Sequence, residues 1–205
     1  MLVDLTYGEL NMSLYHRQEK LDLDVDQTVT IAGCGGIGAW LAIFLAMSGI
    51  KELILFDPDT LDITNLNRLP FPLKWLGMNK AECTKTYIKS IRPEIYIKSY
   101  PFPFQDLFYT KTDWLVDATD KYKTQVKIQE IAKKTSSKYF KVGYDGLHIS
   151  IHNKVATWGE EHDGYTIVPS WVGSPVIVAA LAVAKIVKYP AKEISCNLHD
   201  LFIFR

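Results

Sequence analysis

The feature that most constrains the fold is a glycine-rich segment between two apolar runs. Residues 33–38 have the sequence Gly-Cys-Gly-Gly-Ile-Gly; the run before them, 28–32, is typical of a buried strand, and the run after them, 38–48, of an apolar helix. Glycines let the backbone approach a phosphate, and the N-terminus of the helix offers N–H groups and the positive end of its dipole. The pattern predicts a nucleotide-binding turn. The glycines predicted to line it are Gly33, Gly35, Gly36 and Gly38.

Strand-like and helix-like segments alternate along the first two thirds of the chain. Strands are predicted at 28–32, 53–56, 95–99, 114–117 and 139–142, and helices at 38–48, 80–91 and 123–134. The strands are short apolar runs without alternation, which indicates burial on both faces of a parallel sheet. We therefore predict a doubly wound, Rossmann-like α/β fold.

The last third predicts an antiparallel extension of this sheet. Residues 147–151 and 154–158 alternate around 152–153 as in a hairpin, residues 176–187 form a buried helix introduced by Ser174-Pro175, and 194–198 with 201–204 form a closing antiparallel pair. We find no repeat and no linker. The prediction is a single domain over 1–205, with an N-terminal helical segment (1–25), a nucleotide-binding part (26–145) and C-terminal strands with a buried helix (146–205).

Composition excludes several classes of protein. Lys+Arg and Asp+Glu both number 23, so no net charge draws the molecule to nucleic acid or to an anionic membrane. The apolar stretches 39–47 and 176–184 are shorter than the roughly 18 residues that span a bilayer. The N-terminus lacks the pattern of a secretory signal. Three cysteines without a CxxC pair argue against a disulfide framework or a zinc site, and we expect a cytoplasmic location.

An acidic residue follows the second predicted strand. Asp57 comes 24 residues after Gly33, about where a ribose-binding carboxylate is expected in a dinucleotide fold. Together with the glycine segment, Asp57 fits a NAD-dependent oxidoreductase, and this alternative stays open at this point.

Four further polar residues are not needed for binding a dinucleotide. Asn65 and Arg68 are three residues apart, so one helical turn would direct both at the same point, and Lys80 follows. Asp120 comes just after the fourth strand. Two cations and an amide suit a triphosphate, and a carboxylate at the carboxyl end of a strand suits Mg²⁺.

In these residues the chain resembles the ThiF/MoeB family of adenylating enzymes, whose fold is shared with ubiquitin-activating enzymes. The resemblance extends over nearly the whole chain, including residues 198–205 as a last strand. The matching elements are the nucleotide loop at Gly33–Gly38, the ribose acid at Asp57, the Asn-Leu-x-Arg element at Asn65–Arg68, the phosphate lysine at Lys80, the Thr-Asp pair at Thr119-Asp120 and an N-terminal Tyr-x-Arg-Gln at Tyr15–Gln18.

The resemblance implies a definite reaction. The C-terminal carboxylate of a small ubiquitin-like or sulfur-carrier protein, or of a peptide, attacks the α-phosphate of ATP and gives an acyl-adenylate and pyrophosphate. Asp57 would hold the ribose, and Asn65, Arg68 and Lys80 the phosphates, while Asp120 would bind Mg²⁺. Arg17 would enter the ATP site of the partner subunit in a homodimer.

Departures from the family limit what is implied. Many relatives have two zinc-binding CxxC pairs, and thioester-forming relatives place a cysteine before the late buried helix; neither feature is present here. Cys34, Cys83 and Cys196 are therefore expected to be structural. Lys121 stands where the family often has Asn, and Leu69 where it often has Gln; an extra cation next to Asp120 is expected to weaken Mg²⁺ binding there.

Two alternatives to an adenylating enzyme remain open. A NAD-dependent oxidoreductase would explain the glycine segment and Asp57, but it would give no role to Arg68, Lys80 and Asp120. A non-catalytic subunit of an activating enzyme would not need to keep its nucleotide residues. The sequence identifies neither the carrier nor the group that accepts the acyl moiety after adenylation.

Overall fold

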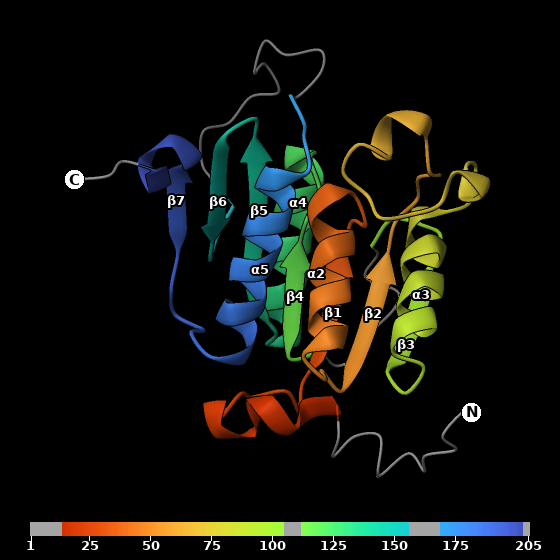
Figure 1. The fold of residues 1–205 in the computed structure, drawn as a ribbon. Helices are drawn as coiled ribbons and strands as arrows, with labels where there is room; N and C mark the ends of the chain where they lie inside the picture. Colours follow the sequence, from red (N-terminus) through yellow and green to blue (C-terminus); the bar gives the residue numbers. More distant parts are fainter. Residues whose placement is uncertain (1–13, 105–111, 156–168, 203–205) are drawn as a thin grey trace, which may run out of the picture.

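The protein is described here by a computed structural model, which covers residues 14–104, 112–155 and 169–202 (Figure 1). A single sheet of seven strands has the order β3-β2-β1-β4-β5-β6-β7. The strands are β1 (Thr28–Ala32), β2 (Glu52–Phe56), β3 (Tyr96–Tyr100), β4 (Trp114–Asp117), β5 (Lys138–Asp145), β6 (His148–His152) and β7 (Ile194–Asn197). The first five are parallel, whereas β6 and β7 are antiparallel. The predicted fold class, including the antiparallel extension, is confirmed.

Helices cover both faces of the sheet. They are α2 (Gly36–Met47), α3 (Lys80–Ile91), α4 (Tyr122–Thr135) and α5 (Gly173–Val187), with short 3-10 segments η1 (His16–Leu21), η2 (Ile63–Asn65), η3 (Leu73–Trp75) and η4 (Leu198–Phe202). Figure 1 shows α2, α3 and α5 in front of the sheet and α4 behind it. The main core lies under α2 and α5, and a smaller cluster lies between α4 and the sheet. This double cover explains why the central strands are apolar on both faces.

Two strands of the C-terminal third differ from the prediction. The predicted hairpin around 152–153 is wrong for the residues described: β5 and β6 form the hairpin, Lys154 and Val155 lie outside any strand, and 156–158 fall outside the described residues. The turn is at Gly146, which has φ +53°, a left-handed conformation that glycine adopts at little cost. β5 is longer than predicted. It pairs with β4 only as far as Lys141, but its pairing with β6 continues to Asp145.

The predicted closing pair is likewise wrong. β7 pairs with β6, and the residues that follow form η4 instead of a second strand. The Leu198 N–H donates to the Leu147 carbonyl at 2.8 Å, and the Leu198 side chain is buried in the main core. These contacts turn the chain away from the edge of β7. Residues 203–205 lie outside the described part, so the end of the predicted strand is not tested.

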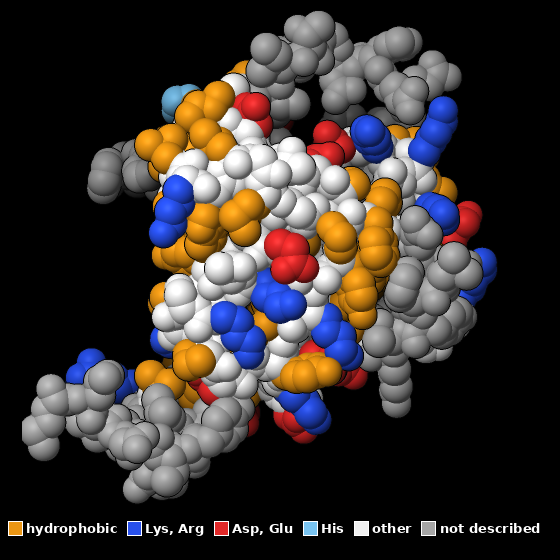
Figure 2. Space-filling view, turned by 90° about the vertical axis from the view of Figure 1, so that its right-hand side faces the viewer, with side chains coloured by type: hydrophobic (Ala, Val, Ile, Leu, Met, Phe, Trp, Pro, Cys, Tyr) orange, Lys and Arg blue, Asp and Glu red, His pale blue; other side chains and the backbone are white. Residues whose placement is uncertain are grey.

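The connection from β2 to α3 forms one side of the molecule, together with α3 itself. It exposes large hydrophobic side chains, with Ile63 at 57% and Leu73 at 66% of their full accessibility. Figure 2 shows this side, where hydrophobic side chains lie among basic and acidic ones. Within the described ranges, we find no helix long and apolar enough to cross a bilayer.

Candidate nucleotide site

The glycine loop lies where the strand order of the sheet reverses. β1 and β4 are neighbours, but the connection after β1 leads to α2 on one face of the sheet and the connection after β4 leads to α4 on the other, so the two connections diverge and open a crevice at the carboxyl ends of these strands. Gly33 has φ +94°, and a Cβ there would lie 2.8 Å from the carbonyl oxygen of Ala118. The loop from β1 is therefore packed against the backbone that follows β4.

The loop leads directly into α2 and leaves the start of that helix uncapped. Gly35 is the N-cap residue, and as a glycine it has no side chain that could accept a hydrogen bond from the first N–H groups. A Cβ added at Gly35 would meet nothing within 4 Å. Backbone N–H groups at a helix N-terminus that no cap side chain occupies form an anion site, and the phosphates of a nucleotide fit this arrangement.

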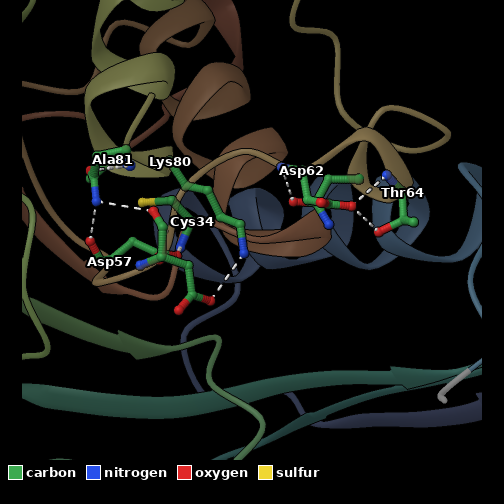
Figure 3. Close-up of polar contacts among 9 residues, drawn as sticks. Cys34, Asp57, Asp62, Thr64, Lys80 and Ala81 are labelled. Atoms are coloured by element: carbon green, nitrogen blue, oxygen red, sulfur yellow. Dashed lines mark hydrogen bonds and ion pairs between the residues drawn. The ribbon is translucent and has the colours of Figure 1, made fainter. Parts of the chain in front are cut away.

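Asp57 is fixed against the glycine loop. Its Oδ2 accepts the Cys34 N–H at 2.6 Å, and its Oδ1 accepts the Asp59 N–H at 2.8 Å (Figure 3). Burial raises the pKa of Asp57, while the two backbone hydrogen bonds and Lys80 lower it. Each carboxylate oxygen keeps a second lone pair, so Asp57 can brace the loop and still accept a hydroxyl group.

Lys80 is the first residue of α3 and is joined to the same cluster through Asp59. Its Nζ lies 3.0 Å from Asp59 Oδ2, and its side chain is 13% exposed, against 66% for Asp59. The helix starts here because the Asn79 side chain accepts the N–H groups of Ala81 and Glu82. Figure 3 shows Cys34, Asp57 and Lys80 close together, with the Asp62–Thr64 contact apart from them. Asp59 thus contacts two site residues, Asp57 through its backbone N–H and Lys80 through its carboxylate.

Asn65 and Arg68 lie on one turn, as predicted, but their side chains do not converge. Asn65 Oδ1 accepts the Asp62 N–H at 3.1 Å and completes a capping box at the start of η2, with Asp62 as the N-cap residue. Arg68 instead extends to the glycine loop: its Cδ and Nε lie 3.2 and 3.3 Å from the position of a Cβ at Gly36. Arg68 Nε is buried and has no hydrogen-bond partner among the residues that the structure describes. A buried guanidinium N–H without an acceptor, next to a phosphate-type loop, fits a phosphate oxygen.

Asp117, not singled out from the sequence, fixes the loop that carries Asp120. Asp117 is fully buried, and it accepts the Thr119 N–H at 3.0 Å, the Thr119 hydroxyl at 2.7 Å and the Tyr139 hydroxyl at 3.0 Å. Burial raises the pKa of Asp117, and these hydrogen bonds oppose the rise. Asp120 itself is exposed three residues beyond the end of β4.

A lysine on β5 accompanies these carboxylates. Lys141 pairs in register with Asp117. Burial lowers the pKa of Lys141, and Asp117 and Asp120 raise it. A lysine inside an otherwise apolar strand was the only sequence signal for it.

The exposed carboxylate of Asp120 fits one ligand position of Mg²⁺. Across 14–104, 112–155 and 169–202, the structure gathers no group of three or more His, Cys, Asp or Glu side chains that could hold a metal ion. The ATP phosphates would supply further oxygen ligands, as they commonly do for Mg²⁺.

The two positions at which the chain departs from the family pattern, Leu69 and Lys121, differ in exposure. Leu69 is buried in an apolar cluster with Ala39, Leu61, Phe71 and Cys83. Lys121 is exposed at the N-cap of α4.

Arg17 lies at the far end of α2 from the glycine loop. It is an exposed residue of η1, whose neighbour Tyr15 donates to the Ala46 carbonyl at 3.3 Å and to Glu94 Oε1 at 3.0 Å. Ala46 is in the last turn of α2, and a helix of 12 residues is about 18 Å long. Figure 1 shows η1, in red, below the amino ends of the parallel strands, whereas the glycine loop follows the carboxyl end of β1. Arg17 therefore does not reach the site of its own chain in this structure.

Comparisons with known proteins agree with this geometry. Residues 9–156 match the ThiF family. Ubiquitin-like modifier-activating enzyme 5 of Bombyx mori is 27% identical over 150 residues, which cover 66% of this chain and 38% of that protein. The tRNA threonylcarbamoyladenosine dehydratase of Haemophilus influenzae is 32% identical over 124 residues, which cover 58% of this chain and 48% of that protein. The matches thus span less than half the length of these two relatives.

A solved structure shows the same fold. The crystal structure of E. coli MccB with ATP matches with a TM-score of 0.70 and 23% identity, over 88% of this chain and 65% of MccB. Another structure shows MccB in complex with N-formylated MccA. Because the family match covers well over half of the chain and includes the glycine loop, Asp57, Lys80 and Asp120, the chain belongs to the ThiF family.

Proposed function

We propose that this protein is an ATP-dependent adenylyltransferase that activates a C-terminal carboxylate as an acyl-adenylate. The substrate is a small ubiquitin-like or sulfur-carrier protein or a peptide. The observation that carries the proposal is the buried Arg68 Nε beside Gly36, which has no partner within 14–104, 112–155 and 169–202, because it supports a phosphate-binding cation against a nucleotide loop. Membership of the ThiF family supports the reaction class.

The proposed roles follow from where each side chain lies. Asp57 accepts hydrogen bonds from the ribose hydroxyl groups. Phosphate oxygens are bound by Arg68 and by the N–H groups at the start of α2. Lys80 exchanges its ion pair with Asp59 for one with a phosphate. Asn65 keeps its amide N–H groups for the same purpose, since its oxygen is used in the capping box. Asp120 holds Mg²⁺, which neutralises charge developing on the phosphates.

The chemistry needs alignment and charge neutralisation, and no protein nucleophile. The substrate carboxylate oxygen forms a bond to the α-phosphorus, the bond from this phosphorus to the bridging oxygen breaks, and pyrophosphate leaves with the electron pair. Fixed cations at the glycine loop favour the transition state because they need no reorganisation as charge moves to the leaving group.

ATP–pyrophosphate exchange tests the proposal. Candidate carriers are small proteins ending in glycine that are encoded near this gene, and each is added to the protein with ATP, Mg²⁺ and labelled pyrophosphate. We expect label to enter ATP only when the cognate carrier is present. ATP hydrolysis to ADP and phosphate, without exchange, would contradict adenylation.

We expect no covalent intermediate on a cysteine of the described part. Cys34 and Cys83 are fully buried, and burial raises the pKa of Cys34 well above its usual range and that of Cys83 to about 11. The thiolate, which is the reactive form, is therefore scarce for both at pH 8. In iodoacetamide labelling at pH 8, followed by peptide mass spectrometry, the half-buried Cys196 should react in the folded protein, whereas Cys34 and Cys83 should react only in urea.

Reaction of Cys34 or Cys83 in the folded protein, at a rate matching Cys196, would show that a buried thiol is activated. A reducible conjugate between the protein and its carrier would contradict the proposed reaction more directly. The triple change Cys34→Ala, Cys83→Ala, Cys196→Ala should leave pyrophosphate exchange largely intact in protein that remains folded.

Arg17 is proposed to act in the site of a second subunit. Arg17→Ala and Lys80→Ala each inactivate a pure homodimer, but a mixed dimer contains one site with both residues, because a two-fold axis pairs each N-terminal segment with the other subunit's site. Mixing the two inactive variants should restore up to about a quarter of the parent exchange activity, since half of the dimers are mixed and each has one working site. Absence of recovery in samples shown to exchange subunits would rule out the crossed arrangement.

A further inference from the structure

Asn67 joins two segments that lie far apart in the sequence. Its Oδ1 accepts a hydrogen bond from Arg68 Nη1 at 2.9 Å, and its Nδ2 donates to the Ser170 carbonyl oxygen at 2.9 Å. Ser170 lies on the connection that enters α5. One side-chain amide thus connects the arginine beside the glycine loop with this connection, using both of its polar atoms.

Ser170 has a second anchor near the glycine loop. Its hydroxyl lies 2.8 Å from the Tyr144 hydroxyl, and Tyr144 is on β5. The Tyr144 hydroxyl and Arg68 Nε are each 3.3 Å from the position of a Cβ at Gly36. Ser170, whose carbonyl oxygen binds Asn67, is therefore connected to β5 through Tyr144. Tyr144 and Arg68 both lie next to Gly36.

The Arg68 side chain needs such support to stay in one place. Arginine has a long, flexible stem, and holding it in one geometry costs side-chain entropy. Nη1 donates to both the Thr64 carbonyl oxygen and Asn67 Oδ1, each at 2.9 Å. Because both acceptors bind this one nitrogen, they fix the guanidinium while the Nε beside Gly36 keeps its N–H for another acceptor.

We propose that Asn67 is a positioning residue for ATP, which holds the guanidinium of Arg68 against the glycine loop. This inference rests on the proposed function, because Arg68 is there assigned to the phosphates. Asn67 acts through Arg68, so it contributes to the binding of phosphate-bearing ligands and not to the binding of the nucleoside. This separates it from a residue that merely supports the fold.

The test compares ATP with adenosine in the full chain. Binding of each is measured by calorimetry or NMR titration for the parent, Asn67→Ala and the matched control Asn153→Ala; both asparagines are exposed, and Asn153 lies after β6. We expect Asn67→Ala to weaken ATP binding about five- to tenfold, less than the loss of a direct charge-assisted hydrogen bond because Asn67 acts through Arg68, and to leave adenosine binding within about twofold. Asn153→Ala should change neither.

A double-mutant cycle with Arg68→Ala identifies the route of the effect. If Asn67 acts through Arg68, Asn67→Ala has no further effect on ATP binding once Arg68 is removed. The inference is overturned if Asn67→Ala leaves ATP binding unchanged, weakens ATP and adenosine equally, or still weakens ATP in the Arg68→Ala background. A parent protein that binds ATP no better than adenosine would instead overturn the proposed phosphate site, and this inference with it.

Discussion

Gly38→Ala is expected to lower the free energy of unfolding by about 3 kcal/mol or more, the upper part of the range for overpacking a rigid site. A Cβ at Gly38 would lie 1.9 Å from the carbonyl oxygen of Gly33, and neither backbone can move away easily, because Gly33 is itself packed against Ala118. The clash falls within the turn that joins β1 to α2. Urea unfolding followed by circular dichroism measures the effect.

Gly35→Ala is the matched control for this change. It adds the same methyl group to the same loop, but the new atom meets nothing within 4 Å. We expect a loss of no more than about 1 kcal/mol, the usual scale of changes at an N-cap. Equal stability of Gly38→Ala and Gly35→Ala would contradict the described geometry of the loop.

Asp120→Ala is expected to reduce pyrophosphate exchange by at least about 100-fold, with little change in stability. Asp120 is exposed, and the loop that carries it is held through Asp117 and Thr119. Removing the Asp120 carboxylate therefore takes away the proposed Mg²⁺ ligand without disturbing its support. Exchange at saturating ATP and Mg²⁺, together with urea unfolding, separates the two effects.

Asp117→Ala provides the contrast. Asp117 is fully buried and accepts three hydrogen bonds, so its removal leaves polar groups of Thr119 and Tyr139 without their acceptor. We expect this variant to lose both stability and exchange. If Asp120→Ala keeps full exchange activity, Asp120 is not the metal ligand. A parent protein that binds ATP but never exchanges pyrophosphate would favour the alternative of a non-catalytic partner subunit.

Local sequence patterns predicted the parts of the site that depend on local structure. The glycine loop lies between a buried strand and an apolar helix, and α3 begins at Lys80 because Asn79 is an effective N-cap. Asp57 lies directly after β2, where the carboxyl ends of parallel strands meet. In each case a short stretch of chain determines both the conformation and the position.

Contacts between distant segments were not predictable in this way. The bond from Asn67 to Ser170 spans 103 residues, and the ion pair of Lys80 with Asp59 spans 21. The hairpin was misplaced because alternation continues past β6 in the sequence, while the turn depends on the backbone of Gly146. Lys141 was missed because a lysine in a strand is usually exposed, whereas here it lies beside Asp117.

The proposed site binds a triphosphate and not a dinucleotide. Calorimetric titration of the purified protein with ATP and Mg²⁺, and separately with NAD, tests this most directly. The glycine loop and Asp57 would serve either ligand, whereas Arg68, Lys80 and Asp120 favour ATP. We predict that the protein binds ATP with Mg²⁺ and does not bind NAD tightly. We also predict that Lys80→Ala weakens the binding of ATP. Tight binding of NAD, without binding of ATP, would contradict a triphosphate site.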